Sequence, residues 1–212
     1  MWSPRSRNFP DNMLLNEVHQ SLADGLPLDG LAWDDSLVRQ AAVLVALTAE
    51  QTPHVLLGRR ASHLALHPGE VAFPGGKREP EDASPWVTAK REAFEEVGIV
   101  ANQVHPLGEL QPLFTRFGFE VHPCVARIPA GLEFVRDPGE FDSLFLAPLA
   151  TFADHDIFRL EQMSDGEHMR MVPHYQVADD NIWGVTAAVL AQLANVAYDA
   201  GIDLQRDWKE KP

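Results

Sequence analysis

Residues 67–85, HPGEVAFPGGKREPEDASP, hold four prolines and three glycines within 19 positions. Proline removes a backbone donor and glycine favours turns, so this density excludes a long helix or strand. Such a stretch is either a loose linker or a loop of defined shape. It leads into SPWVTAKREAFEEVGI, where Ser84 as N-cap, Pro85 at the first helical position and Gly98 as a stop predict a helix. This helix is the best-defined element in the sequence.

Other segments alternate between strand-like and helix-like patterns. Val18 and Leu22 at helical spacing, followed by Gly25, predict a leading helix. A long core helix is expected over 180–201 and a short one over 149–154. Apolar, turn-bounded runs predict strands at 40–48, 53–60, 105–115, 117–128, 141–149 and 168–177, the first two forming a buried hairpin. Because these elements lack a regular βαβ rhythm, the expected fold class is α+β or an α/β/α sandwich around a mixed sheet.

The charge of the chain restricts its partners. Seventeen Lys and Arg against 31 Asp and Glu give a net charge of −14, which opposes nucleic acid and anionic membranes as partners. A polyanionic substrate would then need a local basic pocket or a metal. No apolar run is long enough to span a membrane and the first residues lack the apolar core of a signal peptide, so the expected compartment is the cytoplasm. The single Cys124 excludes an internal disulfide and is expected to be buried.

Three glutamates cluster on the predicted helix. Glu92 and Glu96 lie one turn apart and Glu95 lies beside them, so their carboxylates converge. At about 4 Å and an effective dielectric near ~20, each like-charge pair costs on the order of 4 kcal/mol, which solvated side chains avoid by spreading apart. Alone, the pattern is typical of a solvated helix face. The Gly75–Gly76 pair upstream changes this interpretation, because adjacent glycines permit close backbone approach.

An acidic loop between the glycines and the helix adds to this cluster. Glu79, Glu81 and Asp82 are placed to fold back onto the same face. Oxygen ligands alone select hard divalent cations, Mg²⁺ first and Mn²⁺ second. Since Mg²⁺ shares its shell with substrate phosphates, carboxylates beside a glycine turn indicate phosphoryl or pyrophosphate chemistry.

The stretch from Gly76 to Ile99 resembles the Nudix box, Gly-x5-Glu-x7-Arg-Glu-U-x-Glu-Glu-x-Gly-U, in which U is aliphatic. The second half of the box is matched in order by Arg91, Glu92, Ala93, Glu95, Glu96, Gly98 and Ile99. The first half departs. Counting from Gly76 places Asp82 at the glutamate position with eight residues before Arg91, and counting from Gly75 places Glu81 there with nine. One extra loop residue accounts for both alignments.

A second resemblance lies upstream. Nudix enzymes that hydrolyse coenzyme A share the pattern Leu-Leu-Thr-x-Arg-Ser-x3-Arg-x3-Gly-x-Val-x-Phe-Pro-Gly-Gly. The matching positions here are Leu56, Leu57, Arg60, Gly69, Val71, Phe73, Pro74, Gly75 and Gly76. Gly58, Ala61 and Ala65 depart from the pattern, the last removing an arginine able to contact a phosphate. Candidates to replace that cation are Arg59, His63, His67, Lys77 and Arg78.

This resemblance implies a Nudix-type α/β/α sandwich that hydrolyses the diphosphate linkage of coenzyme A or its acyl forms with Mg²⁺, and Mn²⁺ as a substitute. The products would be 4′-phosphopantetheine and adenosine 3′,5′-bisphosphate. We assign residues 1–30 to an N-terminal helical extension, 31–205 to the Nudix hydrolase domain and 206–212 to a C-terminal tail. A homodimer is compatible with this assignment.

Roles are expected for the residues of both motifs. Glu92 and Glu96 would be the principal metal ligands, with Glu95 making a second-site or water-mediated contact. Glu95, Glu96 or a loop carboxylate would accept the proton of the attacking water, and Arg91 would orient the cluster by pairing a carboxylate such as Glu95. The expected substrate-binding residues are Arg60, His63, Gly75, Gly76 and Lys77. Trp183 is expected in the core.

Two other functions fit the same motifs. One is a Nudix pyrophosphatase acting on ADP-ribose or a dinucleotide, and the other is a non-catalytic Nudix module that senses a nucleotide. The intact Arg-Glu-x-x-Glu-Glu run opposes the second alternative, because a pure binder has no physical need for a repulsive carboxylate cluster.

Overall fold

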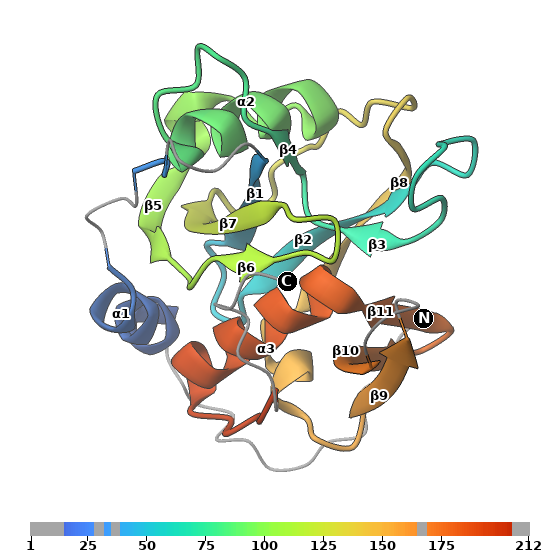
Figure 1. Cartoon of the computed structure of the whole chain (residues 1–212). Coiled ribbons are helices and arrows are strands. Elements are labelled where there is room, and N and C mark those ends of the chain that lie inside the picture. The colour runs from blue at the N-terminus through green and yellow to red at the C-terminus, as the bar shows by residue number, and fades with distance from the viewer. Residues whose placement is uncertain (1–14, 28–31, 35–38, 165–168, 205–212) are drawn as a thin grey trace.

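The computed structural model describes residues 15–27, 32–34, 39–164 and 169–204 (Figure 1). Its main sheet contains β1 (Gln40–Thr48), β2 (His54–Arg60), β3 (Val71–Ala72), β4 (Gly75–Lys77), β5 (His105–Glu109), β6 (Leu113–Phe114), β7 (Glu120–Ile128) and β8 (Phe141–Pro148). The strands β3, β2, β1, β7 and β5 follow one another across the sheet, while β4 pairs with β1, β6 with β7 and β8 with β2. β1 and β7 run parallel and the other pairs are antiparallel, so the sheet is mixed as predicted.

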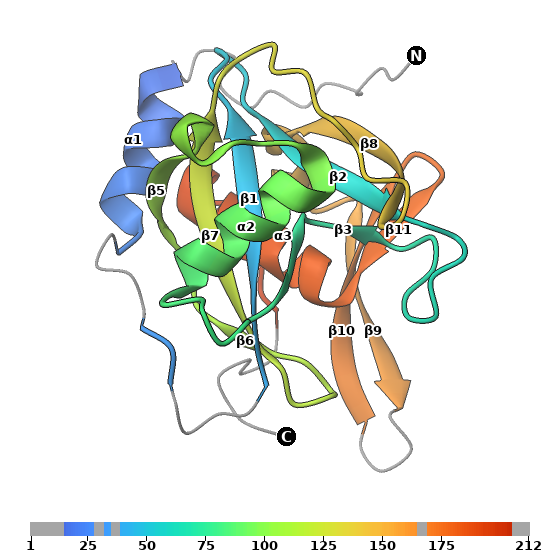
Figure 2. The same ribbon diagram turned by 90° about the horizontal axis from the view of Figure 1, so that it is seen from above.

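Helices cover both faces of this sheet (Figures 1 and 2). α2 (Pro85–Val97) packs on one face, over β1 and β7. The other face is covered by α3 (Gly184–Tyr198), on which α1 (Leu15–Gly25) and the 3₁₀ helix η2 (Leu149–Ala153) pack. A second, three-stranded sheet of β9 (Phe158–Ser164), β10 (Met169–Val177) and β11 (Asp180–Trp183) lies beside α3, and the short 3₁₀ helix η1 (Ala101–Gln103) follows α2. The predicted α/β/α sandwich is confirmed.

The ends of α2 follow from its sequence. Pro85 stands at the first helical position, and Gly98 ends the helix in the left-handed region at φ 75°. The amides of Gly98 and Ile99 donate to the carbonyls of Phe94 and Ala93, which satisfies the last turn. Ser84 has the extended backbone of an N-cap, but its side chain makes no capping hydrogen bond. The helix and its ends were therefore predictable from local signals.

Two features of the C-terminal half differ from the sequence predictions. The segment predicted to be helical from residue 180 is strand β11 as far as Trp183, and α3 begins only at Gly184. β11 pairs with β10, and Gly184 at φ 66° turns the chain from strand to helix. The strand β9 was not predicted at all. Among the described helices, none is both long and apolar enough to cross a membrane.

Candidate active site

The glycine turn before α2 contacts two glutamates of that helix. The Gly75 amide donates a 2.8 Å hydrogen bond to Oε2 of Glu96. The backbone of Gly76 lies so close to the Glu92 carboxylate that an added Cβ would overlap it. These two glycines are the first residues of β4, and they are held in place because they pair with Val43 and Ala42 of β1. The two glycines therefore lie against the carboxylates of Glu96 and Glu92, which are one helical turn apart on α2.

Burial makes these two carboxylates costly to ionise. Glu96 is only 5% exposed, and burial raises its pKa to about 8, with nearby Glu92 and Glu140 adding to the shift and the Gly75 amide and Arg60 opposing it. Burial also raises the pKa of Glu92, against the opposing effect of Arg91. Two neighbouring carboxylates with raised pKa values form a site that a cation would stabilise.

Arg91 is held by a buried aspartate of the preceding loop. Asp82, 3% exposed, accepts hydrogen bonds from Nη2 of Arg91 at 3.0 Å, from the Thr88 hydroxyl at 2.7 Å and from the Glu79 amide at 3.0 Å. Burial alone would raise the pKa of Asp82, but these donors outweigh it and hold that pKa below its usual value. The Asp82 contact also favours the alignment of the box that starts at Gly76.

The remaining donors of Arg91 reach the helix glutamates. Its Nη1 donates to Glu92 at 2.9 Å and to Glu95 at 3.2 Å, so the expected pairing with Glu95 is present. The hydrogen bond to Asp82 contributes most to raising the pKa of Arg91, Glu92 adds to it against the opposing effect of burial, and the guanidinium stays charged. Arg91 thus connects the acidic loop to the carboxylate face of α2 and fixes where Glu92 points.

The donor set fits a hard divalent cation. Glu92 and Glu96 present carboxylate oxygens from one face of α2, and burial, the largest cause of their raised pKa values, disfavours their charged forms unless a cation neutralises them. Glu95, 53% exposed, lies at the solvent edge of this pair. Within the described residues, no three His, Cys, Asp or Glu side chains already form a closed metal-binding group. A metal held by Glu92 and Glu96 would therefore complete its shell with water or substrate oxygens.

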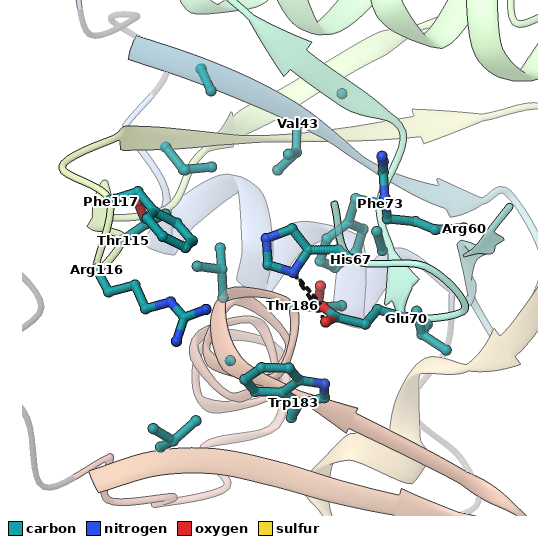
Figure 3. A pocket seen from close by; sticks show the side chains of 18 of the residues that line it. Val43, Arg60, His67, Glu70, Phe73, Thr115, Arg116, Phe117, Trp183 and Thr186 are labelled. Atoms are coloured by element: carbon teal, nitrogen blue, oxygen red, sulfur yellow. Dashed lines mark hydrogen bonds and ion pairs between the residues drawn. The ribbon is translucent and has the colours of Figure 1, made fainter. Parts of the chain in front are cut away.

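A pocket of about 350 Å³ opens from the glycine turn (Figure 3). Arg116 and Phe117 lie on one side of it and Arg60 and Phe73 on the other, with Trp183 below them. Its lining comes from β1, the end of β2, the segment from the β2–β3 loop to β4, the turn between β6 and β7, the start of β7, the second sheet and the start of α3. This volume and mainly apolar lining, with a few charged groups, are typical of a small-molecule site.

The structure brings together only some of the predicted substrate-binding residues. Arg60, Gly75 and Gly76 line the pocket, and Arg60 pairs with Glu140 at 3.6 Å. Lys77 and His63 are exposed and are not among the lining residues. The carbonyl of Lys77 instead accepts a hydrogen bond from Nη2 of Arg91.

Several pocket residues were not predicted from the sequence, among them Trp183, Arg116 and Phe117. Trp183, expected in the core, is partly exposed at the end of β11 and lines the pocket. Arg116 and Phe117 come from the turn between β6 and β7 and carry no local motif. The only signal in the sequence was an arginine beside a phenylalanine, before a glycine, in an acidic chain.

A mixed sheet between two helical layers, with a glycine turn packed against a carboxylate helix, defines a Nudix-type domain. The Nudix domain family matches residues 38–176. The Nudix hydrolase NudL of Yersinia pestis (strain Pestoides F) is 40% identical over 161 residues, covering 74% of this chain and 78% of the relative, and NudL of Yersinia pseudotuberculosis serotype O:1b is equally similar. The chain belongs to the Nudix family and is a Nudix hydrolase.

Solved structures support the fold. A Nudix hydrolase from Alicyclobacillus acidocaldarius superposes with a TM-score of 0.52 at 20% identity, covering 80% of this chain and 96% of that one. At this identity the similarity establishes the shared fold alone.

Proposed function

We propose that the protein hydrolyses the diphosphate linkage of coenzyme A or its acyl derivatives. The observation that carries this proposal is the position of the upstream motif. Five of its matching residues line the pocket: Arg60, Val71, Phe73, Gly75 and Gly76. The last two also contact Glu96 and Glu92 of α2. The segment similar to coenzyme A hydrolases therefore forms the wall that a substrate would meet.

The main mismatch to that motif has little effect on the pocket. Ala65 stands where the motif has its second arginine, and Ala65 is not a lining residue. His67, two positions further along, does line the pocket and bonds Glu70 at 3.0 Å through Nδ1. We infer that His67 supplies the polar group of this loop, and that the substitution at position 65 removes no contact with the pocket interior.

The side chains suggest how hydrolysis would proceed. Glu92 and Glu96 would hold Mg²⁺, which when bound polarises the diphosphate and lowers the pKa of a coordinated water. Arg91 keeps Glu92 oriented and, through Asp82, keeps the acidic loop against the helix. Arg60, beside Glu96, is placed to contact a phosphate oxygen. Glu95 or Glu96 would accept the proton of the attacking water.

A substrate panel tests the proposal. With Mg²⁺ we expect cleavage of coenzyme A to 4′-phosphopantetheine and adenosine 3′,5′-bisphosphate, loss of that activity in excess EDTA, and recovery when Mg²⁺ is restored, all measured by chromatography of the products. Cleavage of ADP-ribose or a dinucleotide with coenzyme A left intact would establish the first alternative. Thermal stabilisation by nucleotide without any cleavage would establish the sensing module.

Replacing Gly76 with alanine should impair catalysis while leaving the fold intact. The new Cβ would displace the flexible end of Glu92, a small structural cost, but would move a proposed metal ligand. We expect kcat/KM to fall at least about tenfold with a melting temperature near that of the wild type. The exposed Gly139, which also lacks a positive φ, provides the matched control Gly139→Ala. Equal activity in both variants would show that Glu92 need not occupy its observed position.

A further inference from the structure

The pocket contains an arginine at its far end from the carboxylate helix. Arg116 lies in the turn that joins β6 to β7, and its guanidinium carbon is 4.5 Å from the centre of the Phe117 ring. Figure 3 shows Arg116 reaching into the pocket above Trp183. Phe117 is 48% exposed, and its ring also contacts His67 edge to face, with 6.4 Å between ring centres. The stack against Phe117 limits the orientations that the guanidinium can adopt.

Arg116 differs from its neighbours in how its charge is balanced. Arg60 pairs with Glu140 at 3.6 Å, and His67 pairs with Glu70 at 3.0 Å. Within the part of the chain that the structure describes, no carboxylate lies within ion-pair distance of Arg116. In a chain with a net charge of −14, a cation that faces a pocket without an acidic partner is a candidate for binding an anionic ligand group.

The sheet places Arg116 away from the proposed metal site. Gly75 on β4 pairs with Val43 of β1, β1 pairs with β7, and Val121 of β7 pairs with Leu113 of β6. Three steps between neighbouring strands, each about 4.8 Å, separate β4 from β6 by roughly 14 Å. The turn that carries Arg116 thus follows a strand three steps from the glycines beside Glu92 and Glu96, and Arg116 lies across the pocket from Arg60 and Phe73 (Figure 3).

We propose that Arg116 binds a phosphate monoester that the substrate carries away from its scissile diphosphate. This inference rests on the proposed function, in which that group is the 3′-phosphate of coenzyme A. A guanidinium held against an aromatic ring can donate two N–H groups to two oxygens of one phosphate. The negative charge of the phosphate monoester would balance the positive charge of Arg116. Arg116 is thus the residue that distinguishes coenzyme A from diphosphates without a third phosphate.

Kinetics on a matched substrate pair test the role of Arg116. We expect Arg116→Gln to lower kcat/KM for coenzyme A by about tenfold to 100-fold, and to change kcat/KM for 3′-dephospho-coenzyme A less than about threefold, since only the first substrate carries the phosphate. Arg127→Gln is the control, because it removes the same charge from an exposed position on β7 outside the pocket. An equal fall for both substrates, or no change for either, would overturn the proposal.

Binding of the expected product gives a second measurement that does not depend on turnover. By calorimetry, the wild type should bind adenosine 3′,5′-bisphosphate at least about tenfold tighter than adenosine 5′-monophosphate, and Arg116→Gln should abolish that preference. If the wild type shows the preference but cleaves only ADP-ribose, the proposed substrate is wrong and the Arg116 subsite stands. If coenzyme A is cleaved but the variant keeps the preference, the subsite is wrong and the proposed function stands.

Discussion

Glu96→Gln will lower turnover on the order of 10³-fold at saturating Mg²⁺, equivalent to about 4 kcal/mol of transition-state stabilisation. The amide keeps the shape of the side chain and can still accept the Gly75 hydrogen bond, but it offers the metal no negative charge. Product formation under single-turnover conditions measures the effect. Turnover within about tenfold of the wild type would remove Glu96 from the proposed ligand set.

The same substitution will stabilise the protein when metal is absent. The pKa of Glu96 in the folded protein, about 8, lies above its ordinary value of 4.5. Between these pH values the folded protein binds a proton that the unfolded chain releases, so stability is lost as pH rises from 4.5 to 8. Glutamine has no proton to lose. In EDTA we expect the free energy of unfolding of Glu96→Gln to exceed that of the wild type by about 2–4 kcal/mol at pH 8 and to be close to it at pH 4.5.

The control for this stability effect is Glu95→Gln on the same helix. Glu95 is 53% exposed, so Glu95→Gln should change the free energy of unfolding by less than about 0.5 kcal/mol. Urea unfolding at several pH values measures the free energy of unfolding of all three proteins. A stability difference between Glu96→Gln and the wild type that stays constant from pH 4.5 to 8 would show that burial of the carboxylate is not its cause. Added Mg²⁺ should stabilise the wild type in preference to Glu96→Gln.

Local sequence signals were sufficient for α2 and the main strands. Pro85 and Gly98 mark the ends of the helix through backbone constraints that act within a few residues. The hairpin of β1 and β2 follows from two apolar runs separated by a short polar turn. The acidic loop was expected to fold onto the helix face, and Asp82 does so through Arg91. In these cases the decisive interactions span few residues, so a single sequence contains them.

The missed elements depend on contacts that are distant in sequence or on surfaces without a buried face. β9 is half-exposed to exposed throughout, so it lacks the apolar alternation that marks a strand. Trp183 is the last residue of β11, which forms because it pairs with β10. The helical periodicity after Gly184 led to the prediction of one continuous helix across this boundary. Arg116 reaches the pocket only because β6 and β7 form a hairpin beside β1. The carboxylate face of α2 was thus predictable, whereas the side of the pocket formed by Arg116, Phe117 and Trp183 required the tertiary structure.

Asp82→Ala will destabilise the protein by about 3–5 kcal/mol, the range observed when one partner of a buried ion pair is removed. The substitution leaves the Arg91 guanidinium, the Thr88 hydroxyl and the Glu79 amide without the acceptor that they share. Because Arg91 also positions Glu92, we expect kcat/KM to fall about 10-fold to 100-fold in the protein that remains folded. Urea unfolding at pH 7 and initial rates measured well below the melting temperature separate the two effects.

Substitution of Glu81, the residue before Asp82, tests whether the specific Asp82–Arg91 contact or the general negative charge of the loop is responsible. Glu81 is exposed, so Glu81→Ala should change stability by less than about 0.5 kcal/mol. The lowered pKa of Asp82 stabilises the fold above about pH 4, and this contribution is lost as pH falls through the folded-state value. Asp82→Asn, which keeps the shape without the charge, should therefore approach the wild type in stability only in acid. Equal effects of the Glu81 and Asp82 substitutions would show that loop charge, rather than the Asp82–Arg91 contact, holds the loop against α2.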